Sequence, residues 1–267
     1  MRVMSYNIWS DTTGNPPWTA RRELVANVLR WHRPDIIGFQ EAKLAMIDQL
    51  QSLLPSEFRW LGTGRDDGRN AGEFCPIFWR EESIAMHEHG TFWLAPKTDT
   101  PAKGWGAMCR RIVTWARFSA HETTQQFVFL NTHFDHFSRR ARRESARLLL
   151  AKAAEIGSGD PLIVTGDFNT REGSETYRIL TGKNGASANA PLPLRDALHE
   201  SAQPPSGPRK TWRGFLRGGI GSARIDFIFV QNAVRVQHHA TIADAEYASD
   251  HLPVLADLEM GEMRKAE

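Results

Sequence analysis

The stretch Pro161–Asn169, PLIVTGDFN, decides how the sequence is interpreted. Its apolar run Leu162–Val164 predicts a buried strand, which a Thr-Gly pair ends. Asp167 and Asn169 follow at the carboxyl edge of that strand, where enzymes built on sheets commonly place polar side chains. An Asp/Asn turn closed by local hydrogen bonds would give the same pattern. The number of other strands that end in this way decides between the two interpretations.

The elements around this stretch occur twice along the chain. Each copy is a predicted strand, a helix that opens with arginines, and a second strand that follows a proline (2–8, 19–31 and 36–39; 126–133, 138–156 and 161–167). The same separation, 34 residues, lies between Asn7 and Glu41 and between His133 and Asp167. Two copies are too few for a solenoid. The spacing predicts two similar layers that each bring polar residues to one edge.

The remaining patterns predict a fold of mixed strands and helices. Thr19 is a candidate N-cap for the first helix. Segments 73–80 and 84–94 are predicted to pair as a hairpin of strands. Further strands are expected at 58–62, 111–118, 224–230, 234–242 and 252–258, and further helices at 44–54 and 174–180. No low-complexity linker divides the chain, so residues 1–260 are expected to form one domain, with 261–267 as a frayed tail.

Composition sets limits on the class of protein. The 267 residues are 41% hydrophobic, which is enough for a sizeable core, and nine Trp and fourteen Phe suggest thick packing between layers. A net charge of +2 is too weak by itself to argue for nucleic acid. Cys75 and Cys109 form no metal-binding pattern and are consistent with free thiols, although one disulfide is also compatible. The opening lacks signal-peptide character and no apolar run approaches membrane-spanning length, so we expect a soluble, cytoplasmic, monomeric protein.

Six strand ends or adjoining loops carry polar residues, and each alone has a simple structural explanation. Asn7 fits a turn, Glu41 a helix start, and His133 a hydrogen-bonded core histidine. Asp226 is different, because it lies within an apolar strand and a buried carboxylate requires a partner. The full set of strand-end residues is Asn7, Glu41, His133 with Asp135, Asp167 with Asn169, Asp226, and Asp250 with His251.

Together these residues supply oxygen ligands for a hard cation, two imidazoles and an amide. Carboxylates without cysteines suit Mg²⁺ or Mn²⁺ better than zinc. Such a cation beside histidines is suited to phosphoryl chemistry.

These residues carry a family resemblance. SYNIW, IIGFQE, NTHFDH, GDFN, RIDFIF and SDHLPV, in this order, resemble the endonuclease/exonuclease/phosphatase superfamily of Mg²⁺-dependent phosphoesterases related to deoxyribonuclease I. The match spans about Arg2 to Leu258. The SYNIW opening and the GEFCPIFWR segment look more like its compact bacterial phosphodiesterase-type and deadenylase-related members than its apurinic endonucleases. The implied fold is a four-layer α/β sandwich of two mixed β-sheets flanked by helices.

The resemblance also implies roles for individual residues. Glu41 matches the metal-binding glutamate and Asn7 the asparagine beside the metal, while Asp250 is a further candidate at the metal site. Asp167 matches the aspartate that orients or deprotonates the attacking water, and Asn169 the amide that holds the phosphate. The remaining matches are the transition-state histidine (His251), the carboxylate that binds it (Asp226), the second phosphate-contacting histidine (His133) and the acid that supports this histidine (Glu73).

The substrate is less closely defined. Candidate contacts are Arg111, the start of the Arg139–Arg147 helix, and the basic loop Arg209–Arg224 with Trp212, which could equally be a solvated loop with one anchored aromatic. We expect a phosphodiesterase acting on a nucleic acid or a small phosphodiester. The alternatives are a phosphomonoesterase for inositol or nucleotide phosphates, and a catalytically silent binding module on the same scaffold.

Overall fold

The structure, a computed structural model, describes residues 1–12, 16–121, 125–183, 193–213, 222–245 and 247–261. Two six-stranded sheets form its centre. The first has the order β11-β12-β1-β2-β4-β3 and the second β5-β6-β7-β8-β10-β9. Their strands are β1 (Arg2–Asn7), β2 (Ile36–Gln40), β3 (Phe58–Leu61), β4 (Ile77–Arg80), β5 (Ile84–Trp93), β6 (Ile112–Ala120), β7 (Gln126–His133), β8 (Leu162–Asp167), β9 (Arg195–Asp196), β10 (Asp226–Gln231), β11 (Val234–Thr241) and β12 (Val254–Met260).

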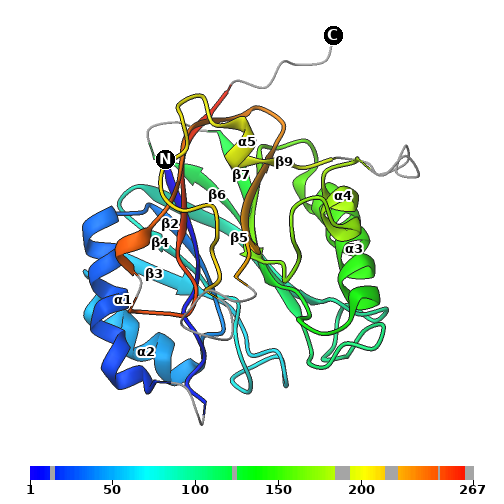
Figure 1. Cartoon of the computed structure of the whole chain (residues 1–267), viewed down its shortest axis with the longest axis horizontal. Helices are drawn as coiled ribbons and strands as arrows, with labels where there is room; N and C mark the ends of the chain where they lie inside the picture. Colours follow the sequence, from blue (N-terminus) through cyan, green and yellow to red (C-terminus); the bar gives the residue numbers. More distant parts are fainter. Residues whose placement is uncertain (13–15, 122–124, 184–192, 214–221, 246, 262–267) are drawn as a thin grey trace.

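Helices cover the outer face of each sheet (Figure 1). On the first sheet these are α1 (Trp18–His32) and α2 (Leu44–Leu53), and on the second α3 (Arg139–Gly157) and α4 (Glu175–Leu180). The short elements α5 (Ala197–Glu200) and η1 (Ala243–Ala245) complete the set in the described residues. The result is the predicted four-layer α/β sandwich.

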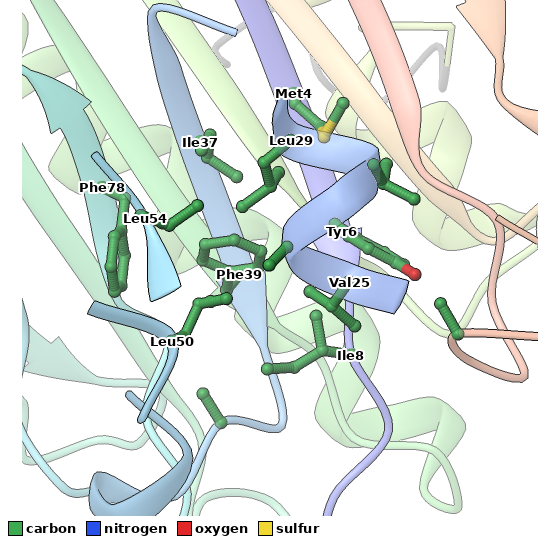
Figure 2. Close-up of a cluster of buried hydrophobic side chains, with 14 of the residues drawn as sticks. Met4, Tyr6, Ile8, Val25, Leu29, Ile37, Phe39, Leu50, Leu54 and Phe78 are labelled. Atoms are coloured by element: carbon green, nitrogen blue, oxygen red, sulfur yellow. The ribbon is translucent and has the colours of Figure 1, made fainter. Parts of the chain in front are cut away.

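The alternation of side chains along the strands builds three large hydrophobic clusters in the described residues, and a fourth is small. In β1, Val3 points between the sheets, whereas Met4 and Tyr6 point to the helices. Figure 2 shows this helix-facing cluster, in which Tyr6 and Phe39 of the sheet pack with Val25 and Leu29 of α1. A third cluster between α3 and the second sheet includes the edge-to-face ring pairs of Phe168 with its neighbours.

The internal duplication predicted from spacing is present in the topology. β1 and β2 pair in parallel at the centre of one sheet, as β7 and β8 do in the other, with antiparallel strands on both sides. The register differs by one residue, however. His133 lies opposite Asp167, whereas Asn7 lies opposite Gln40, and Glu41 comes one residue later.

The predicted hairpin of segments 73–80 and 84–94 is wrong. β4 pairs with β2 and β3, so both of its edges are occupied within the first sheet. β5 therefore pairs with β6 in the second sheet, and the turn between β4 and β5 carries the chain from one sheet to the other.

Three smaller expectations meet different outcomes. The residue before α1 is Pro17, which makes no side-chain cap, so Thr19 lies inside the helix. Cys75 and Cys109 are both free. Of the predicted tail, Gly261 is held by a hydrogen bond from its N–H to the Ala233 carbonyl at 2.7 Å, and residues 262–267 lie outside the described part. None of the helices in the described residues is long and apolar enough to span a membrane.

Candidate active site

Along three of the four central strands, the side chains that face the other sheet change from apolar to polar. On the second sheet, Phe129-Asn131-His133 of β7 and Ile163-Thr165-Asp167 of β8 each run from an apolar through a small polar to a chemically active residue. On the first sheet, β1 repeats the pattern with Val3-Ser5-Asn7. Because parallel strands share a direction, their polar ends gather at one mouth between the sheets.

Asp167 lies at the centre of this mouth and is fully buried. Its Oδ2 accepts from Asn7 Nδ2 at 3.1 Å and lies 3.4 Å from His133 Nε2 and 3.8 Å from His251 Nε2. Its Oδ1 accepts from the backbone N–H of Asn169 at 2.9 Å. Burial raises the pKa of Asp167 to about 7, and the negative charge of Asp226 contributes to the rise.

Glu41 reaches this centre from the first sheet. Its backbone has the left-handed conformation, with φ of 63°, which is uncommon for a non-glycine residue and concentrates at functional sites. Asn7 Nδ2 donates to Glu41 Oε1 at 3.0 Å and so links it to Asp167, while the backbone N–H of Ser10 donates to Oε2 at 2.9 Å. The amide oxygen of Asn7 accepts from the Trp9 N–H, so Asn7 positions the two carboxylates in this arrangement.

His251 and Asp226 form a buried pair. The two side chains are joined by a hydrogen bond of 2.9 Å between His251 Nδ1 and Asp226 Oδ2, which also accepts from Thr211 Oγ1 at 2.6 Å. The buried acid thus has the partner that the sequence required. Burial alone would lower the pKa of His251, but the charge of Asp226 and this hydrogen bond raise it well above its usual value. His251 therefore carries a proton on the ring edge, Nε2, that faces Asp167.

The second sheet and its adjoining segments also bring His133, Asn169 and Arg111 to the mouth. Asn169 has φ of 47°, and its Nδ2 lies 3.0 Å from both His133 Nε2 and the Phe134 carbonyl oxygen. Burial, followed by the charge of Arg111, lowers the pKa of His133 well below its usual value, so this imidazole is neutral. The Arg111 guanidinium is almost completely buried, and its Nε and Nη1 have no hydrogen-bond partner in the described residues.

Glu73, Asp250 and Trp212 line the same cavity, whose volume is about 450 Å³. Glu73 pairs with Arg65 at 2.5 Å, and His133 Nδ1 has no hydrogen-bond partner in the described residues. Burial raises the pKa of Asp250, and a hydrogen bond from the Trp212 side chain opposes the rise. The predicted catalytic and metal-site residues thus meet at one mouth with Glu73, Arg111 and Trp212, whereas the start of the Arg139–Arg147 helix lines a neighbouring cavity. The roles assigned to these residues remain predictions. Residues 214–221 of the basic loop lie outside the described part.

Sequence reasoning missed a polar layer beneath this mouth. Gln40 Nε2 donates to Asn131 Oδ1 at 2.7 Å, and Thr165 Oγ1 donates to the same oxygen at 3.2 Å. Asn131 Nδ2 in turn donates to the Phe39 and Pro76 carbonyls of the opposite sheet. These hydrogen bonds fasten the sheets together immediately below the site. The signal was the period-two spacing of Asn131 and Thr165 from the chemically active strand ends.

Family comparison agrees with this geometry. The model of the endonuclease/exonuclease/phosphatase family matches residues 4–251. The chain belongs to this family. A family member from Bacteroides vulgatus is 36% identical and superposes with a TM-score of 0.89 over 97% of this chain and 98% of that one.

Two further relatives extend the comparison. A mannosyl-6-phosphatase from Bacteroides thetaiotaomicron is 30% identical, with a TM-score of 0.85 over 97% of this chain and 99% of that one. Nocturnin of Drosophila melanogaster is 21% identical over 97% of this chain, which spans only 47% of its length. The family and these structural neighbours are phosphoesterases, so the resemblance seen in the motifs is confirmed.

The donor set at the mouth fits a divalent cation. Glu41, His133 and Asp167 bring ligand atoms within 4.8 Å of one another, and Asp167, Asp226 and His251 form a second such group. Burial is the main cause of the raised pKa of Asp167, and repulsion between its carboxylate and that of Asp226 adds to it. A cation with oxygen ligands would relieve that repulsion.

Proposed function

We propose that the protein is a Mg²⁺- or Mn²⁺-dependent phosphoesterase that hydrolyses phosphodiester bonds of a nucleic acid or a small phosphodiester. One observation carries the proposal. The Asp167 carboxylate, on the second sheet, is hydrogen-bonded to Asn7 of the first sheet, which also holds Glu41, and it faces a charged His251. Phosphoryl transfer to water requires a base, a site for a divalent cation and a proton donor. These three groups surround one cavity here.

Glu41 would hold the cation, with Asn7 and Asp250 beside it. When bound, the cation supplies positive charge that polarises a phosphoryl oxygen and offsets the charge developing on it. Membership of a phosphoesterase family and the acid–histidine groups support this assignment.

Asp167 is the proposed base. A pKa of about 7 suits a group that must accept a proton near neutral pH. A water hydrogen-bonded to this carboxylate attacks phosphorus while its proton passes to Asp167. The new P–O bond forms as the bond to the leaving oxygen breaks, and the leaving group departs with the electron pair.

Four side chains surround the phosphate in this proposal. Asn169 and the neutral His133 bind its non-bridging oxygens, and the buried Arg111 adds a fixed charge through its unsatisfied N–H groups. His251, held charged by Asp226, stabilises the pentavalent state and donates a proton to the leaving oxygen through Nε2. Trp212 lines the same cavity as a contact for the rest of the substrate.

Phosphomonoester hydrolysis is a second candidate, because the 30% identical neighbour is named as a mannosyl-6-phosphatase. Turnover of bis-p-nitrophenyl phosphate and of p-nitrophenyl phosphate, each with Mg²⁺, Mn²⁺ or EDTA, separates the two activities. We expect metal-dependent turnover of the diester and loss with EDTA. Asp167→Asn and His251→Ala should each lower kcat on the order of 10²-fold or more. Wild-type turnover in either variant would refute the assignment, and silence with both esters would leave a binding module.

A further inference from the structure

A second and larger cavity adjoins the catalytic one. Its volume is about 660 Å³, and its walls come from the first turns of α3 and the segment that follows β8. Asn169 and Arg171 line both cavities, so the two share a wall and adjoin at the proposed phosphate-binding amide. The residues that carry its charge are Arg139, Arg142, Arg143, Arg171 and Glu175.

We call this cavity the arginine pocket. Positive charge dominates among the five charged residues that line it. Glu175 is the one carboxylate in its lining, and it pairs with Arg143 at 2.7 Å. Neither Arg139 nor Arg142 has a carboxylate partner in the described residues. Arg142 Nη1 instead donates to the Asp135 carbonyl at 2.8 Å, which fixes this guanidinium in the wall.

The position of these arginines is unfavourable for the fold alone. Arg139 and Arg142 lie in the first turn of the 19-residue helix α3. That turn contains no acid, and the positive end of the helix dipole lies there. Burial, together with the nearby charge of Arg139, lowers the pKa of Arg142. An anion in the pocket would relieve both the mutual repulsion and the dipole penalty, and paired guanidinium groups bind phosphate oxygens particularly well.

We propose that the arginine pocket binds a second phosphate group of the substrate while the first lies at Asp167. The inference rests on the proposed function and adds to it a substrate class, compounds that carry two phosphates. The chain itself links the two subsites, because Asn169 lies at the catalytic phosphate and Arg171, two residues later, lines both cavities. An adjacent phosphate in a nucleotide strand and the second phosphate of a small bisphosphate share this chemistry.

Paired substrates test the pocket. The thymidine dinucleotide TpT is compared with its 5′- and 3′-phosphorylated forms, and a hexose monophosphate with the corresponding bisphosphate, by kcat/KM with Mg²⁺. In at least one pair, we expect kcat/KM to be about 10-fold or more higher for the doubly phosphorylated member, mainly because its KM is lower. Arg139→Ala should reduce that preference about 5-fold or more, and Arg139→Lys should retain part of it.

Arg140 provides the matched control. It belongs to the helix start predicted as a candidate substrate contact, but its exposed side chain lines neither cavity in the structure. Arg140→Ala should therefore keep the wild-type rates and preference. Calorimetric binding of the same compounds to Asp167→Asn protein measures the pocket without turnover, with the same preference expected.

The outcomes separate the inference from the function on which it rests. Hydrolysis without any preference for a second phosphate, or a preference that Arg139→Ala leaves intact, overturns the inference while the phosphoesterase stands. If the wild-type protein hydrolyses none of the compounds, the proposed function is overturned. If Asp167→Asn protein then binds the singly and doubly phosphorylated members of each pair with equal affinity, the inference is overturned as well. A preference within the dinucleotide set indicates a nucleotide strand, and one confined to the hexose pair indicates a small bisphosphate.

Discussion

Asp226 contributes most to keeping His251 charged against its burial, and Asp167 and Asp250 add smaller effects. Because Asp226 raises the pKa of His251, the charged imidazole persists into alkaline solution and is lost only when the pH passes that raised value. Asp226→Asn removes the charge responsible, so the alkaline limb of the kcat–pH profile should move to lower pH. Steady-state kinetics across the pH range measure the shift.

A control shows whether the shift is specific. Asp257 is a carboxylate paired with Arg2 away from the mouth, and Asp257→Asn should leave the limb in place. An Asp226→Asn profile that superimposes on the wild type would refute the role of Asp226 in keeping His251 charged.

His239 makes stability depend on pH. It is buried, neither ring nitrogen has a hydrogen-bond partner in the described residues, and burial together with the charge of Arg224 lowers its pKa to about 4. His239 is therefore protonated below about pH 6.5 in the unfolded chain, but only below about pH 4 in the folded protein. Stability should fall by about 2 kcal/mol between pH 7 and pH 5 from this residue.

Replacing the imidazole tests that prediction. His239→Leu cannot titrate, so urea unfolding at pH 7 and pH 5 should show a smaller acid loss than in the wild type. An unchanged acid loss would show that other groups cause it.

At the scale of elements, β2 lies against the second sheet at Gly38. A Cβ there would collide with Thr165 Oγ1 and Asn131 Oδ1, which belong to the polar layer. Gly38→Ala should therefore lower the free energy of unfolding by about 2–3 kcal/mol, through overpacking and lost hydrogen bonds. Urea denaturation measures the loss.

Gly157 at the end of α3 is the matched control for Gly38. A Cβ at this position would meet Leu162 Cδ1 at 3.8 Å, an ordinary contact. Gly157→Ala should stay within about 1 kcal/mol of the wild type, on the stabilising side. Equal losses in the two alanine variants would argue against a tight polar layer under the site.

At the scale of the whole molecule, the candidate site joins two sheets. Glu41 follows a strand of the first sheet and Asp167 ends a strand of the second, so a cation held by both would favour the folded chain over the unfolded one. At 100 times its Kd, such a ligand adds about 2.7 kcal/mol. Mg²⁺ or Mn²⁺ should therefore raise the Tm by about 5 °C.

Variants locate the source of that rise. Glu41→Gln should lose most of the metal-dependent increase in Tm, because it removes a ligand. Glu155→Gln on α3, an exposed acid paired with Lys152, should keep it. A full increase in Glu41→Gln protein would place the cation elsewhere.

The α/β layers and the strand ends that carry Asp167, Asn169 and Asp226 could be predicted from the sequence, because period-two patterns and turn-forming residues are local signals. The motifs then identified the family. The local sequence patterns did not show that β4 and β5 belong to different sheets, because strand pairing depends on which strand edges remain unpaired.

Which distant groups share a cavity became evident only from the packed fold. It paired Glu73 with Arg65, placed Asn131 beneath the site, and gathered the arginine pocket beside Asn169. The contacts of Asn131 and those that form the arginine pocket join segments far apart in the chain, so no local pattern encodes them. The pKa values of Asp167 and His251 depend on burial and on charges from other strands, and they exist only once the two sheets have packed.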